Sequence, residues 1–201
     1  MKMISFMSKS IALFLYKKKI IDDEHLPVCE FGFELITATI VGFLLIVIVG
    51  LLFKELPAAV LFYFIFVGVR YFTGGYHAAS HFKCKLTLLG CGISFLTMLK
   101  FFMKKYTLLI HISLLIFYFI SVLMFSPVEH PNAPLSAETK KRNRKTSIIM
   151  AIILICTILP GYKYFLKISI IFAVTLFIIA LLIITPKIKE RRDKHYEKAH
   201  S

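Results

Sequence analysis

The sequence contains no tryptophan and few acidic residues. Only 11 of its 201 residues are Asp or Glu, against 25 Lys and Arg, which gives a formal net charge of +14. Without tryptophan, any aromatic belt at a membrane interface must come from tyrosine and phenylalanine. In a soluble protein this excess of positive charge would suggest nucleic-acid binding. No basic stretch is interleaved with aromatic residues as single-strand binders require, so we expect no nucleic-acid partner.

Cysteine is also scarce. The four cysteines, Cys29, Cys84, Cys91 and Cys156, form no C-x-x-C pair, and their spacing fits neither a disulfide framework nor a zinc ribbon. Cys91 and Cys156 lie inside apolar runs, where a cysteine packs as a small core residue. We expect no cleavable signal peptide, because Lys9 interrupts the first apolar stretch and no A-x-A-like site follows it.

Long apolar stretches are what the chain has in excess. Hydrophobic residues make up 58% of the sequence, and the mean hydropathy is +0.79. A bilayer core needs about 20 apolar residues of helix, and the stretch 33–53 carries Glu34 as its sole charge. The sequence therefore predicts an all-α, polytopic integral membrane protein. Six spans are expected at about residues 33–53, 57–72, 86–102, 107–125, 147–159 and 165–185.

The N-terminal residues 5–20 read as a short amphipathic helix lying on the membrane surface. Met7, Ile11 and Phe14 share one face at helical spacing, and lysines 17–19 crowd the polar end. At the other end of the chain, Pro160-Gly161 is a turn dipeptide, so we expect it to close a hairpin between the last two spans.

The basic residues fall mainly on one side of the expected membrane. With six spans and the N-terminus inside, eighteen of the 25 lie on the inner side and six on the outer side. Because positive residues concentrate in cytoplasmic loops, we expect both termini and the segment 70–85 to be cytoplasmic. We expect one membrane domain over residues 1–201. Its parts are an interfacial helix and linker (1–27), a transmembrane core (28–185) and a basic tail (186–201).

The segment 70–85, between two apolar spans, gathers an arginine, two adjacent glycines, two histidines and a cysteine. Cysteine is kept reduced in the cytoplasm, so Cys84 would be available as a thiol. The thiolate is the reactive form, and a neighbouring histidine or positive charge favours it. Lysines flank Cys84, and His77 and His81 precede it. This is the segment that could carry chemistry.

Spacing constrains which histidine can act on the thiol. On one regular helix His77 and Cys84 would lie about 10 Å apart along the axis, too far for proton transfer. His81 and Cys84 would be neighbours at i and i+3, so spacing alone favours His81 as the base. All three could instead bind a metal as H-x3-H-x2-C, although no fourth ligand is evident nearby. An interfacial loop without chemistry is the third interpretation.

The pattern Arg70, Gly74-Gly75, His77-Ala78 and Cys84 resembles the R-x3-G-G-x-H-A-x5-C signature of the accessory gene regulator protein B (AgrB) family. These are bacterial membrane peptidases that process a quorum-sensing propeptide. Chain length, the initial surface helix, the six-span hydropathy and a proline-bearing loop before Lys-rich sequence also fit. The resemblance therefore covers essentially the whole chain. It implies His77 and Cys84 as the catalytic residues, with His77 in place of His81, and no metal or cofactor.

The activity implied by the resemblance is that of a cysteine endopeptidase. Cys84 would attack a carbonyl of the propeptide, with His77 as base and then as acid to the leaving amine. The resulting thioester would pass to an internal thiol or hydroxyl of the same peptide and close a thiolactone or lactone ring. The implied partners are a short AgrD-like propeptide and membrane lipid, and a homodimer is compatible with the sequence.

Four further residues have two interpretations each. Backbone N–H groups around Gly74 and Gly75 could form an oxyanion hole or a plain turn. Arg70 could hold a substrate carboxylate or snorkel to the interface. Glu34 could orient His77 as a third catalytic member, or it could mark the boundary of a span.

A basic loop before the fifth span is a candidate for recruiting the propeptide. An acidic tail would be attracted to it, and salt would weaken that attraction. The alternative is that these residues only set the topology. The candidates are Lys140, Lys141, Arg142, Arg144 and Lys145.

Two other classes of function remain open from the residues alone. Glu34 and His111 are polar residues within spans, which a small transporter or exporter of peptide or solute could use. However, no matched pair of broken helices supports that interpretation, and we expect His111 to be a satisfied packing residue. The other class is a non-enzymatic membrane scaffold.

Overall fold

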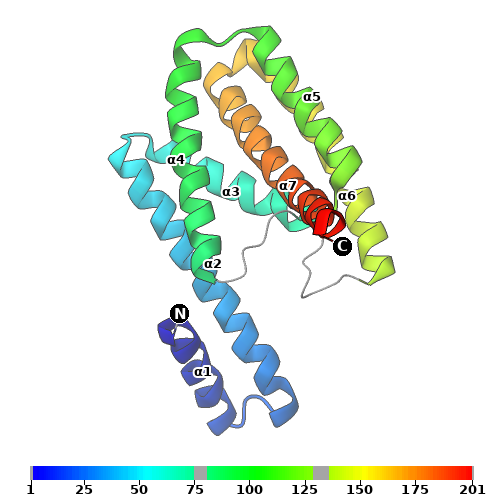
Figure 1. Cartoon of the computed structure of the whole chain (residues 1–201). Helices are drawn as coiled ribbons and strands as arrows, with labels where there is room; N and C mark the ends of the chain where they lie inside the picture. The colour runs from blue at the N-terminus through cyan, green and yellow to red at the C-terminus, as the bar shows by residue number, and fades with distance from the viewer. Residues whose placement is uncertain (1, 75–80, 129–135, 201) are drawn as a thin grey trace.

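The computed structural model describes residues 2–74, 81–128 and 136–200, and over these ranges it is a helical bundle without a strand (Figure 1). Six of the described helices are long and apolar enough to cross a membrane, which confirms the predicted all-α, six-span architecture. The elements are α1 (Lys2–Lys17), the short 3-10 helix η1 (Asp23–His25), α2 (Leu26–Leu52), α3 (Leu56–Thr73), α4 (His81–Lys105), α5 (Leu108–Phe125), α6 (Ala137–Tyr164) and α7 (Leu166–His200).

The connections between helices gather at two ends of the bundle. At one end the Lys167 ammonium lies 2.9 Å from the Glu55 carboxylate, which ties the start of α7 to the α2–α3 connection. At the other end the Val128 N–H donates to the Thr73 carbonyl at 3.1 Å, which ties the exit of α5 to the end of α3. We call these the Lys167 end and the Thr73 end.

Helix α7 is the centre of the bundle and lies among α3, α4, α5 and α6 (Figure 1). In its apolar window 61% of the residues are buried, against 39% or less in each of the other five spans. Ile170, Leu176 and Ile183 have no exposed surface. The other spans therefore pack around α7 and present their remaining apolar surface outward, as expected of helices in lipid.

Small residues let the outer helices approach closely. A Cβ on Gly92 of α4 would lie 2.6 Å from the Ile46 side chain of α2. A Cβ on Gly50 would lie equally close to Ala59 of α3. Between helices in lipid, association depends on such close packing rather than on exclusion of water. These glycines therefore set how near α2 lies to α3 and α4.

Helix α1 packs along the N-terminal part of α2, and the two project from the rest of the bundle (Figure 1). The sequence predicted a helix over residues 5–20, and the structure has one at Lys2–Lys17. Its C-terminal end approaches η1, where a hydrogen bond with Asp23 raises the pKa of Tyr16. The surface orientation of α1 on a membrane stays a prediction.

The expected turn at Pro160-Gly161 is wrong. Helix α6 continues through both residues to Tyr164, and the chain turns at Phe165, whose backbone angles are φ −138° and ψ 58°. A proline removes one backbone donor but keeps a helical φ, and membrane helices tolerate it because neighbouring groups compensate. Helix α7 likewise runs through Pro186 to His200.

The basic stretch is helical rather than a loop. Helix α6 begins at Ala137, and its N-cap Ser136 accepts a hydrogen bond from the Thr139 N–H at 3.3 Å. The five basic residues follow within the first turns: Lys140, Lys141, Arg142, Arg144 and Lys145.

Candidate active site

Cys84 lies in the first turn of α4, at the Thr73 end, as a half-buried free thiol. His81 is the first residue of the same helix, so the i and i+3 relation expected from spacing is present in the backbone. The N-terminus of a helix carries a positive partial charge, which favours a negative group beside it. His77 and Gly75 lie outside the described residues. The His77–Cys84 dyad and the three-ligand metal site both depend on His77, so both stay predictions.

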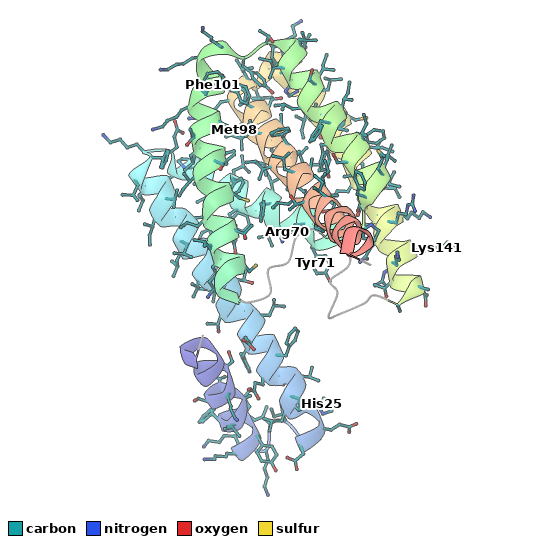
Figure 2. All side chains as sticks on the ribbon, in the orientation of Figure 1. His25, Arg70, Tyr71, Met98, Phe101 and Lys141 are labelled. Carbon is teal, nitrogen blue, oxygen red and sulfur yellow. The ribbon has the colours of Figure 1, made fainter. Side chains whose placement is uncertain are left out.

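Arg70 lies in the last turn of α3 and is half-buried (Figure 2). Its guanidinium carbon is 5.4 Å from the centre of the Phe66 ring. The guanidinium also interacts electrostatically with the thiols of Cys84 and Cys91 on α4. A positive charge near a cysteine favours its thiolate form. A role for Arg70 beside these thiols was not among the two interpretations that the sequence offered for this residue.

Gly74 caps α3 in a conformation that needs glycine. Its φ of 69° and ψ of −152° lie in a region that other residues rarely adopt. A Cβ here would overlap the carbonyl oxygen of Val128 and lie 2.9 Å from its nitrogen. The Gly74 N–H donates to the Arg70 carbonyl at 3.0 Å, so an oxyanion hole in this segment would need donors further along the chain.

Three residues that sequence reasoning missed surround this cap. The Ser126 hydroxyl donates to the Thr73 carbonyl at 3.3 Å, and the Val128 N–H donates to the same oxygen. Thr73, Ser126 and Val128 are all buried. The two segments are 53 residues apart in the chain, and no sequence pattern linked them.

Glu34 lies on the N-terminal half of α2 and is half-buried. Further along the same helix, the Thr39 carbonyl accepts a hydrogen bond from the Tyr63 hydroxyl at 2.7 Å, which begins the contact between α2 and α3. A role for Glu34 in orienting His77 stays a prediction.

The five basic residues near the start of α6 are all exposed. Positive charges at a helix N-terminus oppose the helix dipole, so this placement does not help the helix form. The same dipole adds to their attraction for an anion. Their position therefore suits either the anionic headgroups of a membrane or an acidic ligand.

His111 belongs to a separate buried network at the Lys167 end. The Tyr106 hydroxyl lies 2.8 Å from its Nδ1, and the Ser169 hydroxyl lies 3.4 Å from its Nε2. Ser169 donates its single proton to the Ile158 carbonyl at 2.9 Å, so Nε2–H must donate to Ser169. Nδ1 then accepts from Tyr106, whose pKa is raised by burial and, less, by Tyr162. His111 therefore has the satisfied packing role expected from the sequence.

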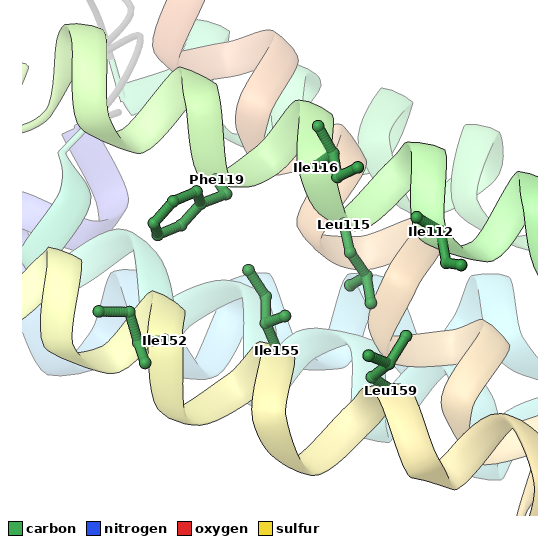
Figure 3. Close-up of a pocket in the computed structure, with 7 residues that line it drawn as sticks. All are labelled: Ile112, Leu115, Ile116, Phe119, Ile152, Ile155 and Leu159. Atoms are coloured by element: carbon green, nitrogen blue, oxygen red, sulfur yellow. The ribbon is translucent and has the colours of Figure 1, made fainter.

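An apolar groove of about 280 Å³ separates α5 from α6 (Figure 3). Seven aliphatic or aromatic side chains line it, and none of them offers a polar atom. Such a groove suits hydrocarbon and contributes nothing to peptide chemistry. Its lining residues are Ile112, Leu115, Ile116, Phe119, Ile152, Ile155 and Leu159.

Comparison with known proteins identifies a family and relatives that cover most of the chain. The family described as "Accessory gene regulator B" matches residues 8–185. A Clostridium perfringens (strain SM101) protein named "Putative AgrB-like protein" is 34% identical over 173 residues, covering 81% of this chain and 79% of its own. A second, from strain 13 and named "Putative AgrB-like protein 2", is 34% identical over 151 residues, covering 71% and 69%.

No solved structure matches the chain. The family match covers five of the six candidate membrane helices in full and the sixth to residue 185, and it includes both segments that meet at the Thr73 end. Membership links the chain to the processing of a quorum-sensing propeptide. The chain belongs to the accessory gene regulator B (AgrB) family.

Proposed function

We propose that this protein is a membrane-embedded cysteine endopeptidase that removes the C-terminal tail of an AgrD-like propeptide and promotes its cyclisation. Cys84 is the nucleophile and His77 is the general base. The observation that carries the proposal is the position of Cys84, in the first turn of α4 and within electrostatic reach of Arg70. A cationic, partly accessible surrounding is what distinguishes reactive cysteines from buried structural ones.

The reaction proceeds in two acyl transfers. The Cys84 thiolate attacks the scissile carbonyl carbon, and the C–N bond then breaks as the leaving amine takes a proton from His77. The acyl group stays on sulfur as a thioester. An internal thiol or hydroxyl of the propeptide then attacks that thioester, loses its proton to His77, and releases Cys84 while the ring closes. A site at the membrane interface limits the water that would otherwise hydrolyse the thioester.

The exposed basic residues of α6 support a recruiting role. They lie on the helix that follows the α5–α6 connection, and that connection contacts the end of α3 through Ser126 and Val128. An acidic propeptide tail bound at Lys140–Lys145 would therefore be held on the same end of the bundle as Cys84. Attraction of this kind raises the local substrate concentration and weakens with salt.

The decisive experiment is co-expression with the candidate propeptide, followed by mass spectrometry of the products. The wild-type protein should yield the released tail and a ring whose mass is lower than that of the linear acid by one water. Cys84→Ala should give neither product, whereas Cys29→Ser and Cys156→Ser should give both. An intact propeptide exported from cells that express the wild type would favour a transporter and overturn the proposal.

A further inference from the structure

We propose that Ser126 and Val128, on the connection after α5, are positioning residues that clamp the start of the catalytic segment at Thr73 and Gly74. The inference rests on the proposed peptidase function. It assigns a role in that reaction to a part of the chain that carries no nucleophile, acid or base.

The clamp consists of two hydrogen bonds to one oxygen. The Thr73 carbonyl is near the C-terminal end of α3, where helix carbonyls have no partner within the helix. It accepts from the Val128 N–H at 3.1 Å and from the Ser126 hydroxyl at 3.3 Å. Thr73 uses its own hydroxyl in the cap, donating to the Val69 carbonyl at 3.1 Å.

Close packing reinforces these bonds. Gly74 and Val128 pair as an isolated parallel bridge, so the two segments of the chain run in the same direction where they meet. The Val128 backbone occupies the space that a Cβ on Gly74 would need. Thr73 has no exposed surface, Ser126 is 6% exposed and Val128 is 8% exposed. Water therefore cannot replace the lost partner of a broken bond without opening this contact.

The clamp acts on the reaction through geometry. Gly74 is the last described residue before the segment that carries His77, and Cys84 lies at the start of the next helix. Fixing the exit of α3 therefore fixes one end of the segment that must bring His77 to the Cys84 thiol. A misplacement of about 1 Å can cost roughly a hundredfold in rate. The clamp should accordingly affect turnover rather than affinity for the propeptide.

Ser126→Ala tests the clamp because it removes one hydrogen bond and leaves the backbone in place. We expect kcat for tail release to fall about tenfold, with KM nearly unchanged. Ser126→Thr keeps a hydroxyl and should restore turnover. Ser121→Ala is the matched control. Ser121 lies on α5 and is buried like Ser126, but its hydroxyl donates to the Phe117 carbonyl of its own helix. A wild-type kcat for Ser126→Ala, or a loss that Ser126→Thr does not restore, overturns the clamp.

Gly74→Ala provides a second test from the opposite side. The added Cβ would displace the Val128 carbonyl, so tail release should fall further than with Ser126→Ala. The control is Gly68→Ala, in the same helix with open space around the new Cβ. Equal activity of Gly74→Ala and Gly68→Ala would contradict the proposed packing.

Hydrogen exchange separates the clamp from the peptidase proposal. In the full-length protein in nanodiscs, the Val128 amide should exchange slowly, and Ser126→Ala should accelerate it severalfold while amides in the centre of α7 are unchanged. Slow exchange at Val128 with no propeptide cleavage by the wild type would contradict the peptidase proposal and still support the contact of Val128 with Thr73. Fast exchange at Val128 in the wild type would remove the clamp, whatever the activity.

Discussion

The Arg70 guanidinium and the Cys84 thiol interact electrostatically across the contact between α3 and α4. Arg70 is half-buried, so solvent screens this interaction less than it would at a free surface. The thiolate is the form of a cysteine that reacts with carbonyls and alkylating reagents. We propose that Arg70 acts on the nucleophile, in addition to the substrate-carboxylate role that the sequence left open.

Replacing Arg70 should therefore slow the chemistry of Cys84 even without a propeptide. In a variant with serine at positions 29, 91 and 156, Arg70→Gln should lower the rate of Cys84 alkylation by iodoacetamide at neutral pH severalfold. Arg70→Lys should retain part of the rate, because it keeps the charge but not the planar guanidinium. An unchanged alkylation rate in Arg70→Gln would show that Arg70 does not affect the reactivity of Cys84, and would leave substrate binding as its proposed role.

Replacing His77 and replacing His81 should have opposite effects on tail release. If His77 is the base, His77→Ala should abolish tail release, and His81→Ala should keep substantial activity because His81 then has no part in proton transfer. Both variants must be compared at equal membrane expression. A His81→Ala protein as inactive as Cys84→Ala would favour His81 as the base, or the three-ligand metal site. Addition of zinc and of a chelator to the wild type would then distinguish these two.

Much of the fold could be predicted because its signals are local. Apolar runs of about 20 residues specify spans directly, and the spans of α3 and α5 agree with prediction to within a residue at each end. Local signals failed where tertiary context decides. Pro160 lies inside α6, since a proline in a membrane helix need not end it.

The candidate site was less predictable than the fold. The spacing of His81 and Cys84 on one helix could be read from the sequence, and the helix begins at His81 as that spacing requires. The contact of Ser126 with Thr73 could not be read, because it joins the end of α3 to the connection after α5, and these come together only when both helices pack against α6 and α7. Such long-range pairs leave no pattern in a single sequence.

Neutralising the basic stretch should weaken binding of an acidic propeptide tail. Changing Lys141 and Arg144 to Gln should raise the KM for cleavage in nanodiscs and leave kcat nearly unchanged, and added salt should reduce the difference between variant and wild type. Lys54→Gln, at the Lys167 end, is the control because it removes a charge from the opposite end of the bundle. Equal KM values, insensitive to salt, would restrict these residues to setting topology.

The His111 network should stabilise the Lys167 end of the bundle without taking part in cleavage. His111→Phe removes a partner from both Tyr106 and Ser169, so we expect a loss of about 1–3 kcal/mol in stability. The thermal unfolding midpoint in detergent should fall, while kcat at a temperature well below it stays near wild type. Ser113→Ala, exposed on the same helix, is the control and should leave the midpoint unchanged. A loss of turnover with an unchanged midpoint would instead assign His111 a functional role.

A thioester on Cys84 should be trappable, because ring closure requires a carbonyl that stays activated after the tail has left. Direct hydrolysis would give a linear acid, from which closing a thiolactone is uphill in water. A propeptide whose internal nucleophile is replaced by Ala should still be cut once, and its N-terminal part should remain attached to Cys84.

Intact-protein mass spectrometry of the enzyme with that peptide should show the added mass, and hydroxylamine should remove it. The Cys84→Ala protein with the same peptide is the control and should show neither the adduct nor the released tail. Where the ring is a thiolactone, exchange between two thioesters is nearly balanced in energy, so the adduct should also form from the purified ring when tail peptide is absent. Tail release at the normal rate with no adduct, even after rapid acid quench, would exclude the covalent mechanism and leave direct hydrolysis.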